Sequence, residues 1–93
     1  MTVTIESAIR EYLLGYHAKD GDKAWLSVLS SEIGGRALGE VTVAWALEMV
    51  RGYKINKKLT PATIRHRVGA LRRCLDWHVT IGNLPLNPLK LLP

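Results

Sequence analysis

The chain has 93 residues, 47% of them hydrophobic, and a formal net charge of +5. Its length suggests one domain, and its hydrophobic fraction argues against disorder throughout. A single cysteine, Cys74, excludes an internal disulfide and fits a reducing compartment. We find no signal peptide and no apolar run near the ~18 residues of a membrane span, so we expect a cytoplasmic protein without a membrane partner.

Positive charge is concentrated in the second half of the chain. Residues 51–93 contain nine basic residues and one acid, Asp76, whereas residues 1–50 contain four basic and seven acidic residues. Between Glu48 and Asp76 there are eight Lys or Arg residues and no acid. Such a block attracts polyanions, although a solvated face without a partner would have the same composition.

Two helices are predicted in the first third of the chain. Thr4 is a suitable N-cap for the first, whose apolar residues keep helical spacing to about His17. A polar turn follows, and the second helix is predicted from about Asp22 to Ile33, with Asp22 as its N-cap. Two consecutive glycines then end it.

A connector over residues 36–41 leads to a third predicted helix. We expect Leu38 and Val41 of the connector to insert into the core. Thr42 is predicted to cap the third helix, which runs to about Tyr53. Its inward residues are expected to be Val43, Ala46, Leu47 and Val50. A basic, polar loop follows.

The longest predicted helix covers residues 60–81. Thr60 suits its N-cap, Pro61 suits its first position, and Gly82 follows its end. Its apolar stripe consists of Ile64, Val68, Leu71, Leu75 and Val79. The small residues Gly69 and Ala70 flank this stripe and would allow the helix to approach a backbone or groove closely.

The fold class that follows is all-α. No alternating strand pattern of useful length is present. We expect residues 1–83 to form a small four-helix, bundle-like domain with a long basic C-terminal helix. Residues 84–93 contain three prolines and little periodicity, and are predicted to be a linker that leaves the domain.

The sequence indicates no catalytic or metal site. His66 and His78 are too far apart on one helix to share an ion, and His17 is isolated. Cys74 has no activating base beside it. We therefore expect no cofactor, no metal and no catalytic residue, and this chain is not expected to be an enzyme by itself.

The stretch Leu59–Arg73, followed by Gly82–Pro88, resembles the core-binding domain of tyrosine recombinases, the phage integrase family. In that family the helix begins with Thr and an aliphatic residue, an Arg-rich turn follows, and Asn-Pro closes the domain. Here these positions read Thr63-Ile64, Arg65-His66-Arg67 and Asn87-Pro88. His66 departs from the pattern, since many relatives have Arg or another polar residue there.

The resemblance implies a SAM-like helical domain that clamps duplex DNA. A linker, here residues 84–93, would join it to a C-terminal catalytic domain with an Arg-His-Arg constellation and a nucleophilic tyrosine, none of which is matched here. We therefore expect the DNA-binding domain of a bacterial or phage-encoded site-specific recombinase or integrase, with a function in DNA integration or recombination. The implied partners are double-stranded DNA, the catalytic domain of the same chain, and other recombinase protomers on the DNA.

The expected DNA contacts lie mainly on the longest helix. His66 and Arg73, opposite the apolar stripe, are predicted to face a groove. Phosphate contacts are assigned to Lys57, Lys58, Thr63, Arg65, Arg67 and Arg72, and the second helix is expected to add Lys23 and Ser27. Two structural alternatives stay open: Arg67 covering the core edge with its stem, and Arg72 pairing with Asp76.

Two other functional classes are considered. A helical protein-interaction module would bind a partner through the tryptophans or the apolar tail. A stand-alone helix-turn-helix regulator is disfavoured, because the loop before the longest helix is basic and about six residues long rather than a tight glycine turn.

Overall fold

The computed structural model describes residues 3–92 and confirms the all-α class. It contains four α-helices and two short 3-10 helices: α1 (Ile5–Gly15), α2 (Asp20–Ile33), η1 (Leu38–Glu40), α3 (Val43–Ile55), α4 (Pro61–Thr80) and η2 (Pro88–Leu91). The β pairing within residues 3–92 is limited to an isolated bridge between Thr4 and Ala37. None of the helices described is long and apolar enough to cross a membrane.

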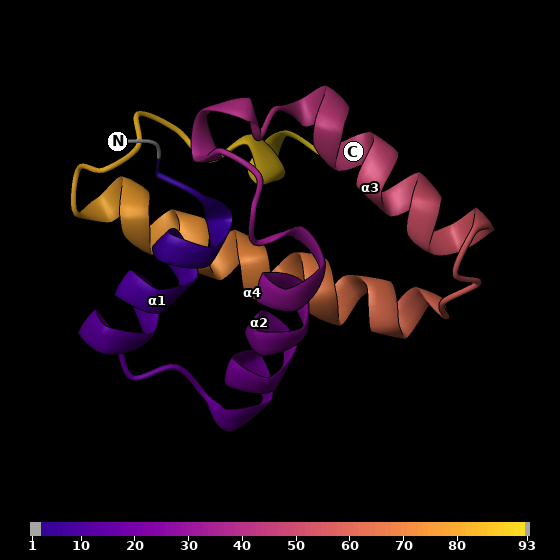
Figure 1. Ribbon diagram of the computed structural model, residues 1–93, viewed down its shortest axis with the longest axis horizontal. Coiled ribbons are helices and arrows are strands. Elements are labelled where there is room, and N and C mark those ends of the chain that lie inside the picture. The colour runs from indigo at the N-terminus through magenta and orange to yellow at the C-terminus, as the bar shows by residue number, and fades with distance from the viewer. Residues whose placement is uncertain (1–2, 93) are drawn as a thin grey trace.

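Helix α4 runs through the middle of the domain, with α1 and α2 on one side of it and α3 on the other (Figure 1). The segment η2 packs against both α3 and α4. The predicted start of α4 is confirmed, because the Thr60 hydroxyl accepts a hydrogen bond from the Thr63 backbone N–H at 3.2 Å and Pro61 occupies the first turn. This arrangement creates two surfaces beside α4, one shared with α2 and one shared with α3.

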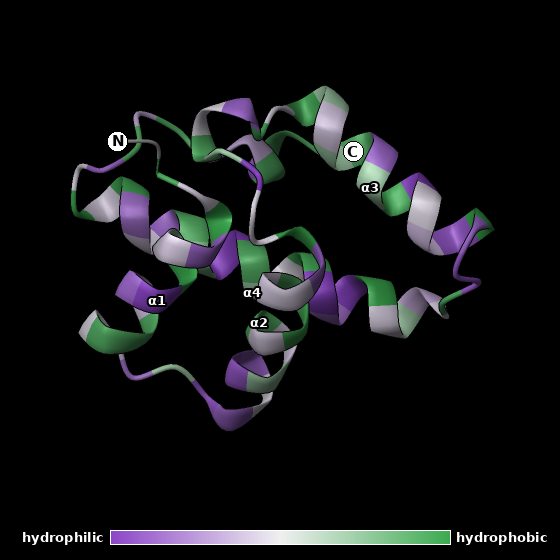
Figure 2. Cartoon of the chain, viewed as in Figure 1, coloured by the Kyte–Doolittle hydropathy of each residue, from purple (hydrophilic) through white to green (hydrophobic). Residues whose placement is uncertain are grey.

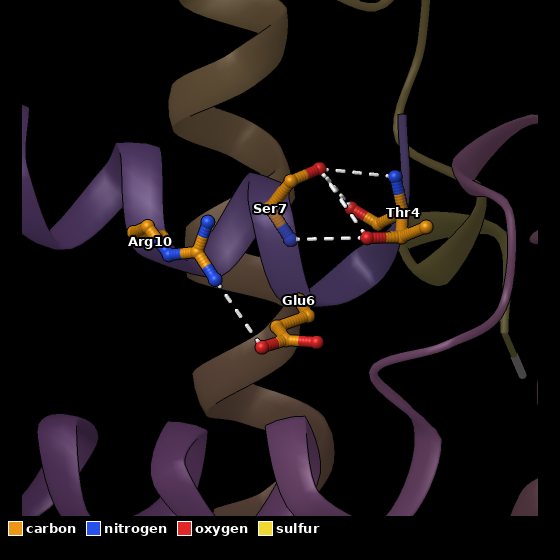
Figure 3. Close-up of polar contacts among 4 residues, drawn as sticks. All are labelled: Thr4, Glu6, Ser7 and Arg10. Atoms are coloured by element: carbon orange, nitrogen blue, oxygen red, sulfur yellow. Dashed lines mark hydrogen bonds and ion pairs between the residues drawn. The ribbon is translucent and has the colours of Figure 1, made fainter. Parts of the chain in front are cut away.

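A capping box begins α1, as the Thr4 position predicted (Figure 3). The Thr4 hydroxyl accepts from the Ser7 backbone N–H at 3.2 Å, and the Ser7 hydroxyl accepts from the Thr4 backbone N–H at 3.0 Å. One turn later Arg10 forms an exposed ion pair with Glu6. The box fixes where α1 starts, so that Ile5 and Ile9 are buried in the core.

Helix α2 begins earlier than predicted, and Asp22 is not its N-cap. The helix starts at Asp20, after Lys19 at the N-cap position, which makes no side-chain capping bond. Asp22 therefore lies inside the first turn, where the helix dipole favours an acidic residue. Its carboxylate binds Arg73 of α4 instead of a backbone N–H.

The buried side of α4 is wider than the predicted stripe. Its buried residues are Ile64, Ala70, Leu71, Cys74, Leu75 and His78, whereas Val68 and Val79 are only half-buried. The reason is that α1 and α2 both pack against the Ala70 and Cys74 side of α4. The expectation that Ala70 would lie at a groove is wrong, since none of its surface is exposed.

A buried histidine joins α4 to α1. The Nε2 atom of His78 lies 2.7 Å from the Ala8 carbonyl oxygen, and its Nδ1 atom lies 3.1 Å from the Asn83 amide nitrogen. A neutral ring that donates from Nε2 and accepts at Nδ1 satisfies both contacts. His78 is thus a core residue held by two partners.

The connector fits its prediction, but α3 does so only partly. Leu38 and Val41 are buried, as expected. On α3, Ala46 is buried, Val43 and Val50 are half-buried, and Leu47 is 45% exposed, so the expectation that Leu47 faces inward is wrong. Helix α3 packs mainly against η2 and α4, and Leu47 lies on the part of its apolar side that they leave exposed.

The C-terminal segment packs on the domain, contrary to the expectation of a linker that leaves it. Asn87 and Leu89 are buried. The Asn87 amide donates to the Arg72 carbonyl oxygen at 2.9 Å and to an Asp76 carboxylate oxygen at 3.0 Å, and Lys90 pairs with the same carboxylate at 3.1 Å. Asp76 is therefore engaged by the tail and not by Arg72. A connection from this segment to a second domain stays a prediction.

Candidate nucleic-acid interface

The exposed side of α4 carries a row of basic side chains. Arg65, His66, Arg72 and Arg73 are exposed, and at 3.6 residues per turn each lies within about 60° of the direction of Gly69. We call these five residues the outer face of α4. Figure 2 shows that hydrophilic and hydrophobic residues are both present along the whole of α4. Because the buried residues of α4 lie on its other side, the outer face remains open to solvent or to a ligand.

Arg73 is held by Asp22 of α2. Its Nε atom donates to one Asp22 carboxylate oxygen and its Nη2 atom to the other, both at 2.7 Å. The Arg73 side chain is 48% exposed, whereas that of Asp22 is 16% exposed. The hydrogen bond from Arg73 lowers the pKa of Asp22 below its usual value. Arg73 thus lies on the predicted face, but with its charge partly balanced.

Arg67 belongs to an ion-pair network with Glu32 and Lys57, in which it is the least exposed member. Its side chain is only 12% exposed, and its Nη1 atom donates to Glu32 at 2.6 Å. The guanidinium lies over the Tyr53 ring, 5.0 Å from its centroid. Lys57 binds the other carboxylate oxygen of Glu32. Arg67 and Lys57, both predicted to contact phosphate, thus share Glu32, and their phosphate contacts stay a prediction. Arg67 covers the core edge with its head group as well as its stem.

His66 is stacked on an aromatic side chain from α2. Its ring is nearly parallel to that of Trp25, with a 4° angle between planes and 5.8 Å between centroids. Trp25 was not among the residues proposed from the sequence, because a half-buried tryptophan is more often a core-edge residue than part of a binding surface. The pair widens the outer face of α4 toward α2.

A cleft of about 470 Å³ lies on the α3 side of α4. Four basic residues and no acid line it: Lys54, Arg65, Arg72 and Lys90. Lys90 pairs with Asp76, but the other three cations have no ion-pair partner in the part of the chain that the structure describes. Lys54 was missed among the predicted contacts, although it lies inside the acid-free block of the sequence.

Two further predicted phosphate contacts, Lys58 and Thr63, lie in the loop before α4 and in its first turn. The Thr63 backbone N–H is already bonded to the Thr60 hydroxyl, and the two hydroxyl groups lie 3.0 Å apart. That N–H is therefore not directed at a ligand. Lys58 is exposed in a left-handed conformation, with φ 52°, and lacks an ion-pair partner among the residues described.

Lys23 and Ser27 of α2 do not join this surface. Lys23 and Ser27 lie two residues before and two residues after Trp25. At 3.6 residues per turn, each therefore points about 160° away from Trp25 around the axis of α2. Because Trp25 is the α2 residue that meets His66, both predicted contacts lie on the far side of α2. The wall that α2 presents to α4 consists instead of Asp22, Trp25 and Glu32.

No protein-family model, no characterised protein and no solved structure matches this chain. Within residues 3–92, no group of three or more His, Cys, Asp or Glu side chains could hold a metal ion. Burial raises the pKa of the Cys74 thiol to about 12, so at neutral pH it is protonated and a poor nucleophile. The basic side of α4 is accordingly the candidate site that the geometry offers.

Proposed function

We propose that this chain binds duplex DNA through the outer face of α4 and the basic cleft beside α3. The observation that carries the proposal is that Lys54, Arg65 and Arg72 are exposed together with no carboxylate partner within residues 3–92. Cations brought together in this way repel one another unless anions lie between them. DNA phosphates supply those anions, and the release of their counterions drives binding.

The shape of α4 suits a duplex. A helix of this length extends about 30 Å at 1.5 Å per residue, which is enough to follow several phosphates. The major groove of B-DNA admits an α-helix, and an exposed row of arginines is the side-chain chemistry that reads it. Arg65 and Arg72 belong both to the outer face of α4 and to the cleft, so a groove that receives α4 would bring the adjacent backbone to the cations of the cleft.

We also propose that this chain is the core-binding domain of a tyrosine recombinase, with a SAM-like fold. Such a domain would hold DNA at a recombination site. The sequence resemblance supports this, together with the observed order of four helices. Asn87-Pro88 supports it too, because buried Asn87 ties the tail to the end of α4 and so closes the domain. A catalytic domain of the same chain and other protomers on the DNA would then be its partners.

A protein-interaction module is the second candidate, and the composition of the cleft favours it. Apolar side chains line the cleft between its cations: Leu47, Val50, Val68, Leu89 and Leu92. Leu47 is 45% exposed. An acidic segment with apolar residues on one side would match this lining, whereas a phosphate backbone would leave the apolar part unused.

A salt-dependent titration tests the proposed function. We expect log K for a duplex to fall against log salt with a slope of about −3 if three phosphates are neutralised, and the Arg65→Ala/Arg72→Ala variant to reduce that slope by about two. Arg10→Ala, which removes an exposed arginine of α1, is the matched control and should leave the slope unchanged. A slope near zero for the wild-type chain would reject DNA binding and favour a protein partner.

A further inference from the structure

The guanidinium of Arg73 is fixed in one orientation. The Asp22 carboxylate accepts one hydrogen bond from the Nε–H and one from an Nη2–H of Arg73. These two N–H groups form the side edge of the guanidinium. The Nη1 group and the second hydrogen of Nη2 form the end edge, and they have no hydrogen-bond partner among the residues described. The Arg73 side chain as a whole is 48% exposed on the outer face of α4.

Gly69 provides the space in which this guanidinium lies. A Cβ atom at position 69 would be 3.2 Å from Nη1 and 3.5 Å from Nη2 of Arg73, and its three nearest contacts would all be Arg73 atoms. Glycine inside a helix costs about 1 kcal/mol relative to alanine, and Gly69 has ordinary helical geometry that alanine could adopt. The guanidinium of Arg73 therefore lies over position 69, and a Cβ atom there would require it to shift by a few tenths of an ångström.

The two contacts favour recognition of a base over attraction to phosphate. Asp22 balances much of the Arg73 charge, so Arg73 is a weaker phosphate anchor than Arg65 or Arg72. The same pair removes rotamer freedom from a long side chain before any ligand binds, which lowers the entropic cost of a directional contact. A fixed pair of N–H donors matches the O6 and N7 acceptors of guanine in the major groove.

We propose that Arg73 reads a guanine, and that Asp22 and Gly69 are positioning residues that leave its end edge over α4 without a hydrogen-bond partner. This inference rests on the proposed binding of duplex DNA. It assigns different tasks to arginines of the same helix, since Arg65 and Arg72 attract the backbone and Arg73 selects a base pair. The carboxylate of Asp22 would be repelled by DNA phosphates, and the inference gives it a role in recognition.

Selection from a random pool of duplexes tests the inference. The wild-type chain should enrich a guanine at one position of the selected site, with a preference of about 5- to 150-fold over another base. Arg73→Lys, Asp22→Asn and Gly69→Ala should each lose the preference at that position and keep it elsewhere. Affinity for the unselected pool should change by less than about threefold for Gly69→Ala, and for Asp22→Asn it should stay the same or rise, because a negative charge is removed.

Two controls separate the possible failures. Arg72→Lys keeps the charge of a backbone contact and should retain the guanine. Helical circular dichroism should show that each variant is folded at the selection temperature. If Asp22→Asn and Gly69→Ala select the same guanine as the wild type, the positioning roles are rejected; if Arg73→Lys does so, the reading role is rejected. If the wild-type chain binds no duplex at low salt, the proposed function fails and this inference fails with it.

Discussion

The two sides of α4 carry similar arginines in different surroundings. On the α2 side, Arg67 and Arg73 each meet a carboxylate, from Glu32 and Asp22 respectively. On the α3 side, Arg65 and Arg72 line a cleft without an acid. The difference shows that the number of basic residues on a helix does not determine the net positive charge that it presents to a ligand. That charge depends on whether the neighbouring helix supplies carboxylates to pair with them.

The two sides of α4 differ because α2 supplies carboxylates to one side and α3 supplies none to the other. Helix α2 comes from the acidic half of the chain and presents Asp22 and Glu32 to α4. Helix α3 contains one acid, Glu48, which pairs with Arg51 of the same helix at 3.4 Å and does not line the cleft. Within the acid-free block, the arginines of α4 that face α3 thus have no ion-pair partner among the residues described.

Both sides depend on Leu71, which fixes α4 in the core, so its replacement should have the largest effect. None of Leu71 is exposed, and Leu71→Ala should lower the free energy of unfolding by about 2–5 kcal/mol because it leaves a cavity. Leu47→Ala, at a leucine that is 45% exposed, should cost less than about 1 kcal/mol. Urea denaturation measures both. Equal losses would mean that Leu47 is buried and that the apolar cleft is closed.

Arginine replacement should distinguish the two sides directly. Arg67→Ala should lower the free energy of unfolding by about 2 kcal/mol, because it removes a nearly buried hydrogen bond between charged groups and leaves Glu32 with Lys57 alone. Arg65→Ala, two residues away on the same helix and exposed, should change it by less than about 0.5 kcal/mol. A similar loss for both variants, again by urea denaturation, would remove the distinction.

Much of the fold could be predicted from local signals. The caps Thr4, Thr42 and Thr60 mark the starts of three helices because each hydroxyl accepts a bond from a backbone N–H three residues later. The start of α2 was misplaced because Asp22 has the chemistry of a cap and also that of an ion-pair partner. Sequence spacing does not reveal that Arg73, 51 residues away, competes for it.

The site was harder to predict, because it depends on contacts between helices. A helical wheel places Arg67 and Arg73 correctly relative to the stripe on α4, but it contains no information about Glu32 and Asp22 on α2. The packed tail escaped prediction for a similar reason. Its prolines suggested a linker, whereas burial of Leu89 and the bonds of Asn87 hold it on the domain.

Acid should weaken the contacts of Glu32 and Asp22 on the α2 side of α4. It should also weaken those of Asp76 with the tail, because the pKa of Asp76 is lowered as well. The hydrogen bond from Lys57 lowers the pKa of Glu32, and that from Arg73 lowers the pKa of Asp22. A carboxyl group with a lowered pKa in the folded state contributes stability that is present above its unfolded pKa, near 4, and is lost as pH falls through its folded pKa. Unfolding midpoints should therefore fall below about pH 4.

Asp22→Asn is the variant that tests this pH dependence. It should flatten the decrease between pH 4 and pH 2, because one of the titrating groups is gone. Thermal melts at several pH values would measure the two profiles. Parallel profiles for Asp22→Asn and the wild type would show that the Arg73 contact does not favour the ionised carboxyl.

The smallest expected effect concerns the energy of the Asp22–Arg73 pair itself. Exposed ion pairs are usually worth about 0.2–1 kcal/mol, and bidentate geometry places this pair toward the upper end of that range. Arg73→Ala should therefore lower the unfolding midpoint by only a few degrees in a domain of this size.

A double-mutant cycle with Asp22→Ala isolates the pair from the separate effects of each truncation. A coupling energy of about 0.5–1 kcal/mol that shrinks in high salt is expected for a pair open to solvent. Coupling near zero would mean that Arg73 samples many orientations, and the outer face of α4 would then present a mobile cation in place of a fixed donor edge.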